Sequence, residues 1–222
     1  MDEIKLIEIK EEILTDNDLA ARELRRKLAE SKTFLVNLMS SPGAGKTTLL
    51  LQTIAVMKQT HKTGVIEADI DSMVDAEKIR EAGVESVQLR TGGFCHLDSL
   101  MVKQGLEALG SDAFDLVFIE NVGNLVCPAE FDTGAIKNVM ILSVPEGDDK
   151  PLKYPLMFST CDVLIVNKTD MMSLTDFDMD RLRGHISRLN PTMKIFEVSA
   201  KTGRGIPPWT EWLRGELSAF LE

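Results

Sequence analysis

Short apolar runs rich in β-branched residues alternate along the chain with longer stretches in which apolar residues recur at helical spacing. Runs of this kind are typical of strands buried on both faces, and the stretches between them are typical of amphipathic helices. The alternation predicts an α/β fold in three layers, with a mostly parallel central sheet covered by helices on both faces. About seven strands are expected, at residues Phe34–Met39, Gly64–Ala68, Ser86–Leu89, Asp115–Glu120, Val139–Val144, Val163–Asn167 and Ile195–Ser199.

The N-terminal segment has a different character. Residues Ile4–Glu30 are rich in charge and carry apolar residues at helical spacing, with a polar interruption at Thr15–Asp18. We expect a helix that is broken at this interruption. Packing on the main fold is the simpler role for it, and docking of a partner is the alternative. The predicted organisation is a helical segment at residues 1–30 followed by residues 31–222, in a single domain overall.

Composition and charge exclude several classes of partner. Hydrophobic residues make up 44% and charged residues 27% of the chain, and no apolar run approaches the roughly 20 residues of a membrane span. The N-terminus lacks the features of a secretory signal, so we expect a cytoplasmic protein. A net charge of -10 opposes binding to nucleic acid or anionic membranes. The chain has 3 cysteines and no export signal, which argues against structural disulfides.

Glycines and a lysine follow the first predicted strand, just before a helical run, at the spacing of a phosphate-binding loop. Gly43 and Gly45 let backbone N–H groups turn toward phosphate oxygens, Lys46 can reach the β and γ oxygens, and Thr47 can ligate Mg²⁺. Ser40 replaces the usual first glycine, which is a small departure. The predicted phosphate-binding residues are Gly43, Ala44, Gly45, Lys46, Thr47 and Thr48.

A second motif, after the sixth predicted strand, indicates which base is bound. The carboxylate of Asp170 can accept hydrogen bonds from N1 and N2 of guanine, whereas adenine offers neither donor. Lys168 can lie across the base, and Asn167 can tie this loop to the phosphate loop. Together the two motifs predict GTP as the nucleotide. The residues expected at guanine O6, after the seventh strand, are Ser199, Ala200 and Lys201.

Acidic residues at two strand ends predict the magnesium and hydrolysis site. Glu120 and Gly123 stand where GTPases place a carboxylate and the glycine whose N–H contacts the γ-phosphate. Asp69, Asp71 and Asp75 follow the second strand; we favour Asp69 and Asp75, and helix capping is the alternative role. The predicted catalytic residues are Lys46, Asp75, Glu120 and Gly123, and the predicted magnesium ligands are Thr47, Asp69, Asp75 and Glu120.

The residue after Gly123 is Asn124, where many fast GTPases carry a glutamine that orients the attacking water. We therefore expect slow intrinsic hydrolysis that a partner or dimerisation accelerates.

Cys95 and His96 are adjacent in a Gly-rich turn that is predicted to open a helix, a position that lowers the pKa of a thiol. Accidental proximity is the alternative explanation for the pair. Cys127, however, lies four residues after Gly123, in a segment expected to move when the γ-phosphate is lost. Two or three ligands from one chain leave a metal shell incomplete, whereas two copies across a two-fold axis would complete it. Cys95, His96 and Cys127 are thus the candidate metal ligands, in a symmetric dimer.

These motifs, with Cys127-Pro128 and Glu146-Gly147-Asp148-Asp149, resemble those of the HypB family of hydrogenase nickel-incorporation GTPases, which are SIMIBI-class P-loop GTPases. The resemblance covers nearly the whole chain. It implies a P-loop NTPase domain at residues 31–222, a GTP-dependent homodimer, Ni²⁺ or Zn²⁺ at the Cys/His site, and Mg²⁺ with GTP. It also implies two protein partners, a small zinc-containing nickel chaperone of the HypA type and the large subunit of [NiFe] hydrogenase.

The resemblance matches Lys153 to a lysine that reaches the nucleotide across the dimer. The chain lacks the N-terminal cysteine motif and the histidine-rich stretch of some members, which argues against nickel storage. A regulatory or cobalamin-enzyme chaperone GTPase without a transition metal is the alternative function. A nucleotide or small-molecule kinase is disfavoured, because it has no need for a guanine-reading loop at Asn167–Asp170.

Overall fold

A seven-stranded sheet forms the centre of the computed structural model, which describes residues 9–69 and 74–222. The strand order is β3-β2-β4-β1-β5-β6-β7, and every neighbouring pair is parallel. The predicted parallel sheet is confirmed, and the sheet is entirely rather than mostly parallel. Its strands are β1 (Phe34–Ser40), β2 (Thr63–Asp69), β3 (Glu85–Arg90), β4 (Leu116–Glu120), β5 (Lys137–Ser143), β6 (Val163–Asn167) and β7 (Lys194–Glu197).

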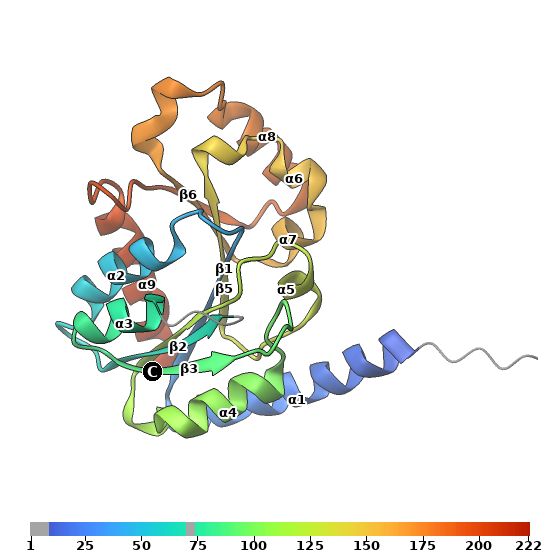
Figure 1. Cartoon of the computed structure of the whole chain (residues 1–222), viewed down its shortest axis with the longest axis vertical. Coiled ribbons are helices and arrows are strands. Elements are labelled where there is room, and N and C mark those ends of the chain that lie inside the picture. The colour runs from blue at the N-terminus through green and yellow to red at the C-terminus, as the bar shows by residue number, and fades with distance from the viewer. Residues whose placement is uncertain (1–8, 70–73) are drawn as a thin grey trace, which may run out of the picture.

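Helices cover both faces of this sheet, as the pattern of apolar residues predicts (Figure 1). Alternate residues of one strand point to opposite faces, so Val36 of β1 joins the core under α2 and α9, whereas Leu35 joins the core under α1 and α4. A third cluster lies under α7 and α8. The helices are α1 (Ile9–Ser31), α2 (Lys46–Met57), α3 (Val74–Glu81), α4 (Ser99–Leu109), α5 (Cys127–Glu130), α6 (Lys150–Lys153), α7 (Pro155–Thr160), α8 (Met179–Leu189) and α9 (Ile206–Leu221), with 3-10 turns η1 (Ser111–Ala113), η2 (Val144–Glu146) and η3 (Thr169–Leu174).

The fourth strand begins at Leu116 rather than Asp115, the seventh ends at Glu197 rather than Ser199, and two further predictions about the elements are wrong. Val144 lies in η2 rather than at the end of a strand, because Ser143 and Glu146 form a capping box that turns the chain there. The N-terminal helix has no break, and α1 runs through Thr15–Asp18. Asp16 and Asp18 are exposed, whereas Asn17 turns inward and finds hydrogen-bond partners on the main fold. The earlier part of the predicted helix, residues 4–8, lies outside the described residues.

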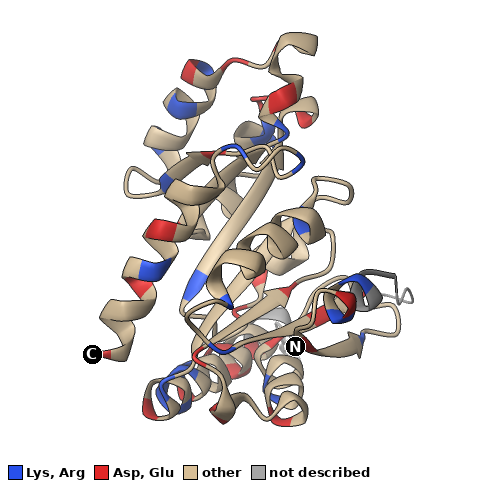
Figure 2. Cartoon of the chain, turned by 90° about the vertical axis from the view of Figure 1, so that its left-hand side faces the viewer, with Lys and Arg blue, Asp and Glu red and all other residues tan. Residues whose placement is uncertain are grey.

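Charges of both signs are mixed along the helices, including α1 and α9 (Figure 2). Within the described part of the chain, none of the helices combines the length and the apolar character needed to cross a bilayer.

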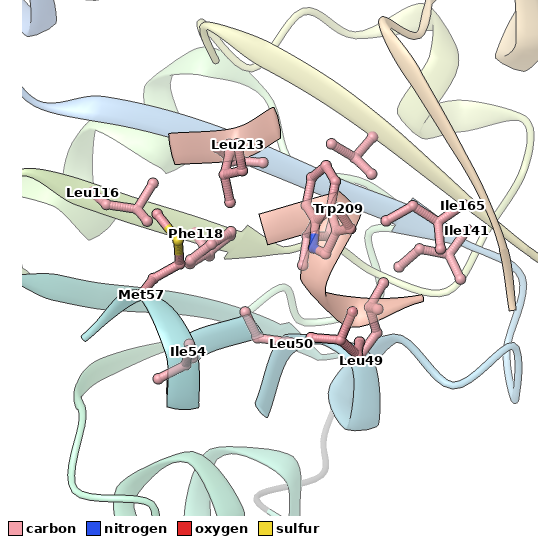
Figure 3. Packing of buried hydrophobic residues seen from close by; sticks show 14 of the residues in the cluster. Leu49, Leu50, Ile54, Met57, Leu116, Phe118, Ile141, Ile165, Trp209 and Leu213 are labelled. Carbon is pink, nitrogen blue, oxygen red and sulfur yellow. The ribbon is translucent and has the colours of Figure 1, made fainter. Parts of the chain in front are cut away.

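The core under α2 and α9 is built around Trp209 of α9 (Figure 3). Its side chain is fully buried, and its indole N–H donates to the hydroxyl of Thr53 on α2 at 2.9 Å. Ile141 and Ile165 of the sheet lie on one side of the indole, so it joins two helices to two strands (Figure 3). This packing fixes α2, whose first residues belong to the phosphate loop.

We predict that Trp209→Ala lowers the free energy of unfolding by about 3–5 kcal/mol, because it leaves a cavity and removes the hydrogen bond that the Thr53 hydroxyl accepts. Urea unfolding followed by circular dichroism measures the change. Leu174→Ala is the control, because Leu174 is 76% exposed and its truncation should cost less than about 0.5 kcal/mol. Equal costs for the two variants would contradict the central role of Trp209 in this core.

Candidate nucleotide and metal site

The phosphate loop lies between the end of β1 and the start of α2. Gly43 and Gly45 have φ values of 75° and 93°, a left-handed conformation that favours glycine. A Cβ on Gly45 would lie 2.6 Å from the Asn167 Nδ2 atom, so a side chain does not fit there. The loop borders a cavity of about 420 Å³. Its lining includes Ser40, Ser41, Pro42, Gly43, Gly45, Lys46, Thr47, Thr48, Asp69, Lys78, Val122 and Gly123.

Glu120 connects the end of β4 to this loop. Its carboxylate accepts a hydrogen bond from the Thr47 hydroxyl at 2.6 Å and lies 3.5 Å from the Lys46 Nζ atom. The Glu120 side chain is only 2% exposed, so the ion pair with Lys46 is shielded from water. A hydroxyl and a carboxylate side by side, with Asp69 lining the same cavity, form an oxygen donor set that fits Mg²⁺.

The predicted base-reading residues come together at the ends of β6 and β7. The Asn167 amide donates to the Ala44 carbonyl at 2.9 Å and accepts from the Ala200 N–H at 3.0 Å, so it joins the two loops. The Lys168 ammonium donates to the Gly43 carbonyl at 2.6 Å. These contacts place both residues beside the phosphate loop, and the bond of Asn167 is the link between the two loops that its position predicts.

Asp170 is exposed at the mouth of this loop. It accepts a hydrogen bond from the Ser199 hydroxyl at 2.6 Å, and this bond is the main reason that the pKa of the Asp170 carboxyl is lowered. The group therefore stays ionised near neutral pH, as an acceptor for guanine N–H groups requires. Of the residues predicted at guanine O6, Ala200 uses its N–H in the hydrogen bond to Asn167, and Lys201 is exposed.

Three other predicted residues are absent from the described lining of the cavity. Asp71 lies outside the described residues, and of Asp75 the structure describes only the backbone, in α3. Lys153 is exposed on α6, with its Nζ atom 2.6 Å from the Asp149 carboxylate, and it is not among the described residues that line the cavity of its own chain.

Two residues of the nucleotide site were missed from the sequence. Lys78 lines the cavity from α3, and Glu146 accepts a hydrogen bond from the Ser41 hydroxyl of the phosphate loop. The capping-box spacing of Ser143 and Glu146 is a signal that could have identified the second. Lys78 has no such local signal, since lysines on helices usually point into solvent.

The three candidate metal ligands lie together on one chain. One ligand atom from each of Cys95, His96 and Cys127 lies within 4.8 Å of the others. The two sulfur atoms are 2.9 Å apart, and the His96 Nδ1 atom is 3.9 Å from the Cys95 sulfur. The third ligand atom beside the Cys95–His96 pair favours a metal site over accidental proximity.

The surroundings of the imidazole favour metal binding, whereas those of Cys127 oppose the loss of its proton. The His96 ring stacks on Phe131 with centroids 3.8 Å apart, and burial lowers the pKa of His96, which keeps the ring in the neutral form that binds metals. A hydrogen bond with Cys95, followed by burial, raises the pKa of Cys127, so binding of a metal must displace its proton.

The helix predicted to open at Cys95 begins later in the chain. Helix α4 begins at Ser99 and is capped by Asp98, whose carboxylate accepts from the Met101 N–H at 2.8 Å. Cys95 thus lies four residues before the first residue of the helix.

Asn124 joins the two sites. It follows Gly123, where a Cβ would lie only 3.1 Å from Pro42 of the phosphate loop. The Asn124 amide donates to the Cys95 carbonyl at 3.3 Å and accepts from the Val126 N–H at 3.0 Å. The residue at the position of a catalytic glutamine is therefore hydrogen-bonded to the loop that carries two of the candidate metal ligands.

Residues 34–197 match the model of the CobW/HypB/UreG nucleotide-binding domain. The chain belongs to the CobW/HypB/UreG family. It is 45% identical over 217 residues to the hydrogenase maturation factor HypB of Azotobacter chroococcum, covering 98% of this chain and 71% of that protein.

Solved HypB structures have the same fold. The structure of HypB from Helicobacter pylori in complex with nickel matches with a TM-score of 0.86 and 36% identity, covering 93% of this chain and 97% of that one. HypB from Archaeoglobus fulgidus matches with a TM-score of 0.84 and 37% identity, covering 91% of this chain and 99% of that one. The resemblance to the HypB family is confirmed, and the chain is a nucleotide-binding GTPase of this family.

We predict that Asp170→Asn reduces the affinity for GTP about 10- to 100-fold and leaves the affinity for ATP unchanged, because the amide replaces one guanine acceptor with a donor. Displacement of a fluorescent nucleotide by GTP and by ATP measures both affinities. Asp176→Asn, at an exposed aspartate in the following loop, is the control. If Asp170→Asn kept the full preference for GTP, Asp170 would not read the base.

Proposed function

We propose that the chain is a GTPase metallochaperone in which GTP binding and hydrolysis gate the site of Cys95, His96 and Cys127 for nickel delivery during maturation of [NiFe] hydrogenase. The observation that carries this proposal is the placement of three metal-binding atoms within 4.8 Å of one another, on segments that Asn124 ties to the nucleotide site. The names of the similar proteins, a hydrogenase maturation factor and a nickel-bound HypB, support it.

In this proposal different residues around the cavity bind the phosphates of GTP, hold Mg²⁺ and contact the γ-phosphate. Backbone N–H groups of the phosphate loop and the Lys46 ammonium bind the β and γ phosphates. Thr47 and Glu120, with Asp69 and Asp75, hold Mg²⁺, which when bound neutralises charge on the phosphate oxygens. The Gly123 N–H contacts the γ-phosphate, so its loss on hydrolysis releases the segment that leads to Cys127.

The cargo is a thiophilic divalent ion. Two thiolates and one imidazole suit nickel and zinc alike, and they leave at least one position of a four-coordinate shell to be filled. A second copy of the chain across a two-fold axis supplies that ligand, which makes a homodimer part of the proposal. A HypA-type nickel chaperone is the proposed donor or acceptor of the ion, and the hydrogenase large subunit is its destination.

The contacts of α1 with α4 and with the segment before β5 support a proposal about domain organisation. We treat the helical segment 1–30 and the P-loop GTPase domain 31–222 as one cooperative unit, because these contacts involve buried side chains on both sides.

The function is tested by light scattering after size-exclusion chromatography, with GDP or a GTP analogue and with or without stoichiometric Ni²⁺. We predict that wild type forms a nickel-containing dimer with the analogue and that Cys95→Ala with His96→Ala loses bound nickel. Cys161→Ala is the control, because Cys161 is buried away from the triad. Nickel bound equally by all three proteins would contradict the proposed site, and a monomer under all conditions would contradict the dimer.

Asn124→Ala should uncouple the two sites, because it removes the hydrogen bonds to the Cys95 carbonyl and the Val126 N–H. We predict that the ratio of nickel affinities in the GDP and GTP-analogue states falls toward one. Competition with a chromogenic chelator measures both affinities. Asn190→Ala, at an amide that bonds to the end of α7 instead, is the control. A ratio unchanged from wild type would show that Asn124 does not carry the coupling.

A further inference from the structure

Both segments that carry metal ligands are fastened to the N-terminal helix by a single side chain. Asn17 of α1 is 7% exposed, although the residues on either side of it are exposed. Its amide group makes hydrogen bonds to two segments that are separate in sequence, one at Ser99 and the other at Asp132. Burial of an amide is unfavourable unless both its donor and its acceptor are used, and here both are used.

The first bond set holds the loop of Cys95 and His96. The Asn17 Oδ1 atom accepts from the Ser99 N–H at 2.9 Å and from the Ser99 hydroxyl at 2.8 Å. The same hydroxyl lies 3.2 Å from the Asn17 carbonyl. Ser99 is the first residue of α4 and is 1% exposed, so the point at which the ligand loop enters the helix is fixed from α1.

The second bond holds the segment of Cys127. The Asn17 Nδ2 atom donates to the Asp132 carbonyl at 2.9 Å. Asp132 directly follows Phe131, the residue on which the His96 ring stacks. The Asp132 carboxylate is in turn held by Arg25 of α1, with an N–O distance of 2.8 Å for one of two bonds. Helix α1 therefore fixes both ends of the contact between His96 and Phe131.

We propose that Asn17 is a positioning residue of the metal site, which holds the Cys95–His96 loop and the Cys127–Phe131 segment at the separation that metal binding needs. This inference rests on the proposed function, since it assumes that the triad binds a metal. Asparagine suits the role because one planar amide offers a donor and an acceptor side by side in two diverging directions, whereas aspartate lacks the donor and an apolar residue lacks both. Ligands on half-buried loops bind more tightly when supporting hydrogen bonds fix them beforehand.

The proposal is tested on the full chain by measuring Ni²⁺ affinity and the thiolate-to-nickel charge-transfer absorption of wild type, Asn17→Ala and Asn17→Asp. We expect Asn17→Ala to weaken nickel binding about tenfold and to change the absorption band, because the loops no longer present the ligands in one arrangement. Asn17→Asp keeps the acceptor for Ser99 and loses the donor to Asp132, so its affinity should lie between the other two.

Thr53→Ala is the matched control. Thr53 is buried, and its hydroxyl is hydrogen-bonded to Trp209 on the other face of the sheet. Removal of this hydroxyl therefore destabilises the fold but changes no contact of the three metal ligands. A purely structural role for Asn17 would give the same affinity loss in both variants and an unchanged absorption band in each, and that result would overturn the proposal. Wild-type affinity and spectrum in Asn17→Ala would also overturn it.

Hydrogen exchange of the metal-free proteins separates this inference from the proposed function. If substitution of Asn17 speeds hydrogen exchange in both segments 94–98 and 131–132, Asn17 positions these two segments. If wild type at the same time binds no nickel, the metal function is refuted while the positioning of the two segments stands. Unchanged exchange in either segment would overturn the positioning role whatever the metal affinity. If Asn17→Ala does not fold, the same comparisons are made with Asn17→Asp.

Discussion

A chain of buried side-chain amides holds the start of the segment on which both sites depend. Asn121, which follows Glu120, donates to Asn37 in β1 at 3.1 Å, and Asn37 donates to Asn138 in β5 at 3.0 Å. Asn37 and Asn121 are almost fully buried, so breaking either bond would leave a desolvated amide, at a cost of about 1–3 kcal/mol. The end of β4 is thereby fixed to the middle of the sheet.

From this fixed point the chain reaches the metal ligands within a few residues. Glu120 touches Thr47, Gly123 packs against Pro42 of the phosphate loop, and Asn124 bonds to the loop of Cys95. Because the segment is anchored at its start, we expect a displacement of Gly123 to move the residues toward Cys127 rather than the sheet. In our interpretation this geometry couples the state of the nucleotide to the arrangement of the metal ligands.

The parallel sheet and the local motifs could be predicted from the sequence because they depend on residues close together in the chain. Hydrophobic runs fix the strands, and the order of phosphate loop, Asn167–Asp170 and Ser199–Lys201 fixes the nucleotide site. Contacts between distant residues could not be predicted in this way. Phe131 under His96, Asn17 between two loops and the turn of Asn124 toward Cys95 have no local pattern. The wrongly predicted break in α1 has the same origin, since tertiary hydrogen bonds of Asn17 outweigh a weak local propensity.

Our central claim is that the nucleotide site and the metal site are coupled. It is tested most directly by measuring the affinity of wild type for a GTP analogue with and without bound nickel. Coupling is reciprocal, so the factor by which nickel changes the affinity for the analogue must equal the factor by which the analogue changes the affinity for nickel. We predict equal factors of about 5- to 150-fold, the usual range for coupled sites. An affinity for the analogue that is the same with and without nickel would contradict the coupling.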